Sequence, residues 1–240
     1  DREMKILSIG SSFSQDAQRY LHRIATANAQ DLKCVNLYIG GCSLRTHFLN
    51  ILDDERAYSF EFNGEPTGLF VSSRAALKSD CWDYVTLQQT SLESCDFNSF
   101  TPYIERIAQF VHTYCPKTEI LIHQTWAYGD RSSLLAKVGF SNAEDMFAKV
   151  KQAYDRASEA LGGARLIPSG QAMLTAHRKA PEILYRDDLH ASFGFGRYLL
   201  ALTWYYTLFG KQSSALAPTV LDEAVSEANL KFADEIAKSV

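Results

Sequence analysis

Short apolar runs alternate along the chain with longer stretches in which apolar residues recur every three or four positions. The first apolar run covers residues 4–9 and ends at Gly10, and from Gln15 the spacing of apolar residues becomes that of a helix. Later runs of the same kind predict further strands at residues 33–39, 83–89, 119–124 and 165–167. Five short strands separated by helices indicate an α/β fold, with one doubly wound parallel sheet covered by helices on both faces.

One segment departs from this alternation of strands and helices. Residues 57–72 follow a period of two on both sides of Asn63-Gly64, a dipeptide that favours the tight turn of a β-hairpin. We therefore expect a β-hairpin excursion near residues 57–72. The chain contains no internal repeat and no linker-like stretch, so residues 1–240 are predicted to form a single domain.

Composition and charge narrow the classes of partner. The 240 residues are 46% hydrophobic and carry a formal net charge of −4 without a basic block, which argues against nucleic acid or an anionic membrane as the main partner. The longest uncharged apolar stretch, residues 198–210, is too short to span a bilayer. No targeting segment precedes the first strand, so we expect a periplasmic or secreted protein if Asp1 is a signal-cleaved end, and a cytoplasmic one otherwise. The oligomeric state does not follow from the sequence.

The cysteines are odd in number, widely spaced and free of Cys-x-x-Cys pairs: they are Cys34, Cys42, Cys81, Cys95 and Cys115. This pattern excludes the usual zinc and dithiol signatures and does not resemble a disulfide framework. One bridge is possible, but we expect most of these side chains to be small buried hydrophobes.

Two polar clusters stand at opposite ends of the sequence. Ser12 follows the first strand, and Asp187 and His190 stand three residues apart just before a strongly apolar helix. A serine hydroxyl becomes an effective nucleophile when a histidine, itself oriented by a carboxylate, takes its proton. In a simpler interpretation the serines form a turn and a helix cap, and the histidine is a surface residue. The positions of both clusters near the carboxyl edge of the sheet, where open α/β folds bind ligands, favour a Ser-His-Asp site.

The same segments resemble the sequence blocks of the SGNH (GDSL-type) hydrolases. The run Gly10-Ser11-Ser12-Phe13-Ser14 is similar to their first block, Gly41 to their second-block glycine, and Asp187-x-x-His190 to their last block. Within that superfamily the chain is most similar to a bacterial branch of DUF4886-like proteins, which have "Gly-Asn-Ser-Phe-Ser" starts and "Leu-Gln-Gln" third strands. The resemblance implies a three-layer α/β/α sandwich around a flavodoxin-like five-stranded parallel sheet, without a cofactor or a metal.

By this resemblance, Ser12 is the nucleophile, His190 is the base and Asp187 is the acid that orients it. Asp188 is an alternative acid, but its spacing to His190 is one residue shorter than in the family. The resemblance also assigns the oxyanion hole to the backbone amides of Ser12 and Gly41.

The third block departs from the family pattern. Most members have Gly-x-Asn-Asp there, and the asparagine side chain helps to bind the oxyanion, whereas this chain has Leu87-Gln88-Gln89-Thr90-Ser91. The carbohydrate acetylesterases of the superfamily, including the sialate type, have Gln-Gly-Glu at this place, and Gln89-Thr90 is similar to its first half. A glutamine amide can donate as an asparagine amide does. We therefore expect Gln89 to contact the oxyanion, with Gln88 as the rival.

Two aromatic residues follow the strand at 119–124. Trp126 and Tyr128 stand where a substrate platform would lie, and aromatic faces stack well on sugar rings, although buried aromatics commonly belong to the core. Together these features predict a serine esterase that hydrolyses a small acyl ester, in particular an O-acetyl group on a small molecule or glycan, through an acyl-enzyme. The alternative is a non-catalytic flavodoxin-like binder, which would hold a phosphorylated ligand in the serine-rich loop or bind a glycan.

Overall fold

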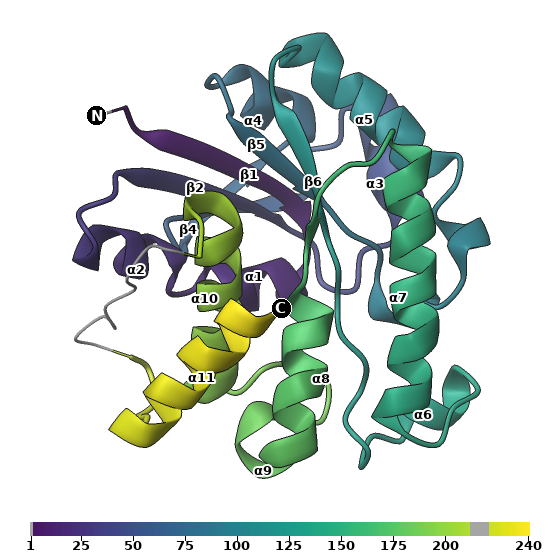
Figure 1. The fold of residues 1–240 in the computed structure, drawn as a ribbon. Helices are drawn as coiled ribbons and strands as arrows, with labels where there is room; N and C mark the ends of the chain where they lie inside the picture. Colours follow the sequence, from purple (N-terminus) through teal and green to yellow (C-terminus); the bar gives the residue numbers. More distant parts are fainter. Residues whose placement is uncertain (1, 212–220) are drawn as a thin grey trace.

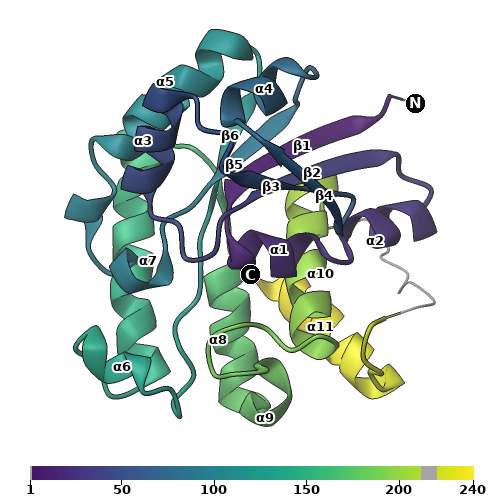
Figure 2. The same cartoon turned by 180° about the vertical axis from the view of Figure 1, so that it is seen from behind.

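A computed structural model describes residues 2–211 and 221–240 and shows one central sheet between two layers of helices (Figures 1 and 2). Within these residues the sheet has seven strands in the order β4-β3-β2-β1-β5-β6-β7. The strands are β1 (Met4–Gly10), β2 (Leu32–Tyr38), β3 (Tyr58–Phe62), β4 (Glu65–Val71), β5 (Tyr84–Leu87), β6 (Glu119–His123) and β7 (Leu166–Ile167). The five strands β2-β1-β5-β6-β7 run parallel. The predicted three-layer fold with a five-stranded parallel sheet is therefore confirmed.

The helices bury apolar side chains against the sheet or against neighbouring helices. They are α1 (Ser12–Gln18), α2 (Leu21–Ala27), α3 (Leu44–Asp53), α4 (Ser73–Lys78), α5 (Tyr103–Tyr114), α6 (Leu134–Lys137), α7 (Ala143–Ala160), α8 (Ser169–Lys179), α9 (Pro181–Leu184), α10 (Phe195–Phe209) and α11 (Glu227–Ser239). One hydrophobic cluster takes its helical side chains mainly from α3, α4, α5 and α7, and a second takes them mainly from α1, α2, α8, α10 and α11. Within residues 2–211 and 221–240, no helix has both the length and the apolarity to cross a membrane.

The hairpin expected at residues 57–72 consists of β3 and β4, and it extends the main sheet. Strand β3 pairs antiparallel with β2, so the hairpin forms one edge of the sheet (Figure 2). Asn63 and Gly64 form its turn with φ values of 50° and 82°, the left-handed conformations that a two-residue hairpin of this kind demands.

All five cysteines are free, and the expectation that most are small buried hydrophobes is confirmed for three of them. Cys34, Cys42 and Cys115 are buried, Cys95 is half-buried and Cys81 is exposed. Because a buried thiol contributes by packing, the three buried cysteines add to the packed interior.

Candidate active site

The nucleophile candidate sits on the tight connection between β1 and α1. Ser12 is the first residue of α1, and Ser11 caps the helix by accepting a hydrogen bond from the backbone of Phe13 at 3.2 Å. A Cβ added at Gly10 would lie 1.9 Å from the Ser14 hydroxyl oxygen, so the close turn needs a glycine. The strand-turn-helix junction thus presents Ser12 at the carboxyl end of the central strand.

The structure brings Ser12, His190 and Asp187 into one hydrogen-bonded chain. The Ser12 Oγ atom lies 3.0 Å from His190 Nε2, and His190 Nδ1 lies 2.7 Å from Asp187 Oδ2. Since the ionised carboxylate can only accept, Nδ1 carries the imidazole proton and Nε2 is left as the acceptor for the serine proton. This arrangement of nucleophile, base and orienting acid is the one that activates a serine hydroxyl.

The Asp187 carboxylate is fixed by the backbone as well as by the imidazole. Its Oδ1 atom accepts the N–H groups of Leu189 and His190, at 3.0 and 2.5 Å. Burial raises the pKa of Asp187, but the hydrogen bonds from the His190 ring and from the two N–H groups outweigh it and hold the pKa below its ordinary value. The acid therefore stays charged while it orients the base.

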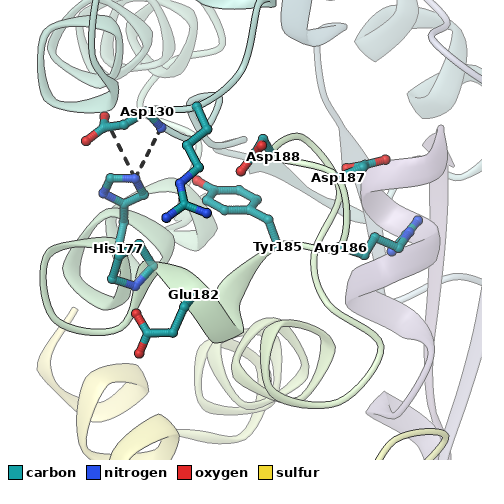
Figure 3. A pocket seen from close by; sticks show the side chains of 9 residues that line it. Asp130, His177, Glu182, Tyr185, Arg186, Asp187 and Asp188 are labelled. Atoms are coloured by element: carbon teal, nitrogen blue, oxygen red, sulfur yellow. Dashed lines mark hydrogen bonds and ion pairs between the residues drawn. The ribbon is translucent and has the colours of Figure 1, made fainter.

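Asp188, the alternative acid, faces another part of the molecule. Figure 3 shows it beside Tyr185, in a pocket of about 310 Å³ whose lining also includes Asp187 but not His190. Asp188 adopts a left-handed φ of 61°, which turns the chain between the two catalytic candidates. Within the part of the chain that the structure describes, the carboxylate that contacts the His190 ring is that of Asp187.

A pocket of about 210 Å³ opens directly at the nucleophile. Its lining includes Ser12, Gly41 and His190, together with apolar side chains from Phe13 and from three leucines: Leu92, Leu134 and Leu189. The backbone N–H groups of Ser12 and Gly41 have no acceptor among the described residues. Two amide donors beside a nucleophile are what an oxyanion hole requires.

The structure contradicts the oxyanion role expected for the Gln89 side chain. Its Nε2 atom donates to the carbonyl and the hydroxyl of Ser99, at 3.0 and 3.1 Å, so both amide protons are used. Gln88, the rival, points to the opposite face of the strand. There its Nε2 donates to Ser11 Oγ at 2.8 Å and its Oε1 lies 2.7 Å from His123 Nδ1. Both glutamines are buried and stabilise the surroundings of the site.

The aromatic platform expected at Trp126 and Tyr128 is also wrong. Both side chains have 0% exposure, so neither offers a ring face to a sugar. Trp126 instead stacks on Phe13, with ring centroids 3.9 Å apart, and its Nε1 donates to the Leu189 carbonyl at 2.8 Å. Tyr128 forms part of the pocket wall and its hydroxyl donates to Ser91 at 3.0 Å. These residues support the nucleophile and the histidine loop from within the core.

Comparison with known proteins identifies the family. The model of a domain of unknown function, DUF4886, matches residues 5–238. The chain belongs to the DUF4886 family. A DUF4886 protein from Bacteroides uniformis has 28% sequence identity and a TM-score of 0.90, over 99% of this chain and 94% of that one. No curated protein matches the sequence.

More distant structures share the architecture of this DUF4886 chain. A candidate SGNH hydrolase from Slackia heliotrinireducens has 21% identity and a TM-score of 0.61, over 86% of this chain and all (100%) of that one. An acetylxylan esterase from Geobacillus stearothermophilus, in a catalytic-mutant form, has 12% identity and a TM-score of 0.60, over 89% of this chain and 97% of that one. At these identities the likeness shows the fold, which is that of the SGNH hydrolases.

Sequence reasoning missed the residue that anchors the histidine loop of this DUF4886 chain. Asp16 on α1 is fully buried, and its Oδ1 accepts from Arg186 Nη1 at 2.9 Å and from Arg197 Nε at 2.8 Å. Its Oδ2 accepts the backbone N–H of Ala191 at 3.1 Å. In the same loop the backbone N–H of Arg186 donates to the His190 carbonyl at 3.0 Å. The only signal was a charged residue inside the apolar repeat of the first helix.

The described residues contain no cluster of three or more His, Cys, Asp and Glu side chains that could hold a metal.

Proposed function

We propose that this chain is a serine esterase that removes a small acyl group, in particular acetyl, from a carbohydrate. The observation that supports it most is the hydrogen-bonded chain from Ser12 through His190 to Asp187, at 3.0 and 2.7 Å, beside a pocket that Ser12, Gly41 and His190 line. The SGNH-hydrolase fold agrees with an esterase-type activity.

In the proposed mechanism Ser12 attacks the ester carbonyl carbon while its proton passes to His190 Nε2. The electron pair of the carbonyl π bond moves to the oxygen, which the backbone N–H groups of Ser12 and Gly41 stabilise. When the tetrahedral intermediate collapses, the departing alcohol takes the proton from His190. A water molecule, deprotonated by the same imidazole, then releases the acyl group from Ser12. Asp187 stays ionised throughout and stabilises the imidazolium that forms twice in each cycle.

The size of the pocket supports a short acyl chain. About 210 Å³ bordered by Phe13 and the leucines accommodates a small group, and its apolar wall suits a methyl rather than a charged substituent. Carbohydrate as the alcohol partner is supported by the acetylxylan esterase among the proteins that share the fold.

The test is the hydrolysis of p-nitrophenyl acetate and of acetylated xylan by the purified protein. We expect Ser12→Ala to lower kcat by about 10⁴-fold or more, because the covalent step is lost. The matched control is Ser133→Ala. Ser133 is exposed, and its side chain makes no capping hydrogen bond to the α6 helix that it precedes. Ser12→Ala protein that hydrolyses both esters at the wild-type rate would remove Ser12 as the nucleophile. Wild-type protein that binds acetylated xylan without hydrolysing either ester would instead indicate a non-catalytic binder.

A further inference from the structure

One buried side chain joins two walls of the pocket at the nucleophile. The Oε1 atom of Gln89 accepts the backbone N–H of Leu44 at 2.9 Å and that of Thr90 at 2.8 Å. Leu44 begins α3, three residues after Gly41, and Thr90 follows β5. The other end of the Gln89 amide is held by Ser99, and the side chain is 1% exposed. Gln89 thus fixes the distance between the Gly41 loop and the end of β5.

Thr90 is the side chain that this clamp places in the pocket lining. It borders the same pocket as Ser12, Gly41 and His190, and it is half-buried. Its hydroxyl has no hydrogen-bond partner among the described residues, although its backbone N–H is held by Gln89. A threonine hydroxyl can donate one hydrogen bond, and no described residue takes the one from Thr90. A partnerless hydroxyl at this place is available to a ligand oxygen.

We propose that the Thr90 hydroxyl is a third donor to the oxyanion and that Gln89 is the positioning residue that holds it opposite Gly41. This inference rests on the proposed function. When the Ser12 oxygen bonds to the carbonyl carbon, the negative oxygen accepts hydrogen bonds from the N–H groups of Ser12 and Gly41 and from the O–H of Thr90. The Thr90 proton stays on its oxygen, so the step transfers no proton besides the one that His190 receives. The interaction strengthens as charge develops and therefore lowers the barrier.

Ser91 is the competing donor. It lines the same pocket, but its hydroxyl oxygen already accepts from the Tyr128 hydroxyl at 3.0 Å and its backbone begins a short 3-10 helix, Ser91–Glu93. That bond ties the Ser91 side chain to the pocket wall. The Ser91 proton is still free to donate, so Ser91→Ala is compared with the Thr90 variants.

The kinetic test compares Thr90→Val, which keeps the branched shape and loses the hydroxyl, with Thr90→Ser, which keeps the hydroxyl. We expect Thr90→Val to lower kcat for p-nitrophenyl acetate by about 10²-fold with KM changed less than about twofold, since a transition-state contact is lost. Thr90→Ser should stay within about tenfold of the wild type. The matched control is Thr113→Val, at an exposed position on α5. Thr90→Val with wild-type kcat, or Ser91→Ala showing the loss in its place, overturns the proposal.

The positioning role of Gln89 is tested by coupling. Gln89→Ala should lower kcat as Thr90→Val does, and the double variant should lose little more than either single change, because both remove the same contact. Additive losses overturn the positioning role. Should Gln89→Ala fail to fold in a thermal unfolding scan, the two Thr90 variants decide the proposal alone.

A second measurement separates this inference from the proposed function. A fluorophosphonate places its phosphoryl oxygen where the oxyanion forms, so Thr90→Val should slow covalent labelling of Ser12 by about 10²-fold as well. Labelling that is lost in Ser12→Ala and unchanged in Thr90→Val overturns the role of Thr90 and leaves the esterase proposal in place. Wild-type protein that neither hydrolyses the esters nor reacts at Ser12 overturns both.

Discussion

The ionic contact between α1 and the histidine loop leads to a sharp prediction for Asp16→Asn. The substitution conserves volume and removes one charge that is 0% exposed and that two arginines share. Figure 3 shows Arg186, one of the two, extending toward α1 from the loop that carries Asp187. An asparagine at this position still accepts the Ala191 N–H or one arginine, but it no longer balances the guanidinium charges.

The size of the effect follows from burial. Removing one partner of a buried ion pair costs about 3–5 kcal/mol. The side chains of Arg186 and Arg197 are 22% and 10% exposed, so water solvates part of the unbalanced charge and we take the lower end, about 3 kcal/mol. In a domain of this size each kcal/mol moves Tm by about 2–4 °C. Asp16→Asn should therefore lower Tm by about 6–12 °C.

The assay is thermal unfolding followed by far-ultraviolet circular dichroism, with Glu144→Gln as the matched control. Glu144 forms a two-point contact with Arg178, but both side chains are 51% exposed, so its loss should cost at most about 1 kcal/mol and 2–4 °C. In the folded Asp16→Asn protein at 25 °C we also expect esterase activity to fall, because the His190 loop loses its anchor. A Tm decrease no larger than that of Glu144→Gln would refute the idea that this buried charge holds the site together.

Three further predictions address other parts of the molecule. The pKa of Asp187 is held below its ordinary 3.8, so its carboxylate stays charged as the pH falls and should add no ionisation near pH 4 to the acid limb of kcat/KM. An ionisation near pH 4 that disappears in Asp187→Asn would contradict this. Native protein should react quickly with a disulfide reagent at the exposed Cys81 and not at the buried Cys34, because burial raises the pKa of the Cys34 thiol to about 12. Equal reaction rates at the two thiols would disprove this prediction. Trp126→Phe should cost about 1–3 kcal/mol in urea unfolding, because the Leu189 carbonyl loses its buried donor. A raised KM for acetylated xylan with unchanged stability would restore the platform interpretation.

The sheet and the serine-histidine-aspartate spacing could be predicted because they depend on local pattern. A strand that closes on glycine and passes into a helix is visible within a dozen residues, and parallel strands bring such junctions to one edge. The junction at Gly10 and the Asp187–His190 spacing are of this kind, and the structure places Ser12 beside His190. Their catalytic roles stay predictions.

The side-chain partners could not be predicted, because they come from distant segments. Alternation along an extended segment puts Gln89 on the same face as Val85 but does not reveal its partners. Its bonds to Ser99 and Leu44 depend on the fold of two separate connections. A tryptophan after a strand looks the same in the sequence whether it binds substrate or packs in the core. The stacking of Phe13 on Trp126, which places Trp126 in the core, is visible only in the structure. The burial of a single side chain depends on tertiary packing, and neither the spacing of apolar residues nor secondary-structure propensity determines it.

The contact between Ser12 and His190 joins positions 178 residues apart, from the first helix to the loop before α10. During synthesis the strand and helix that carry the serine are complete long before the histidine has been added. A partly made or partly folded chain therefore contains an ordinary, unreactive hydroxyl at this position. Contacts of such long range form late and slowly. Phosphonate labelling of Ser12 should consequently report the last stage of folding, and after dilution from denaturant it should return later than the helical signal.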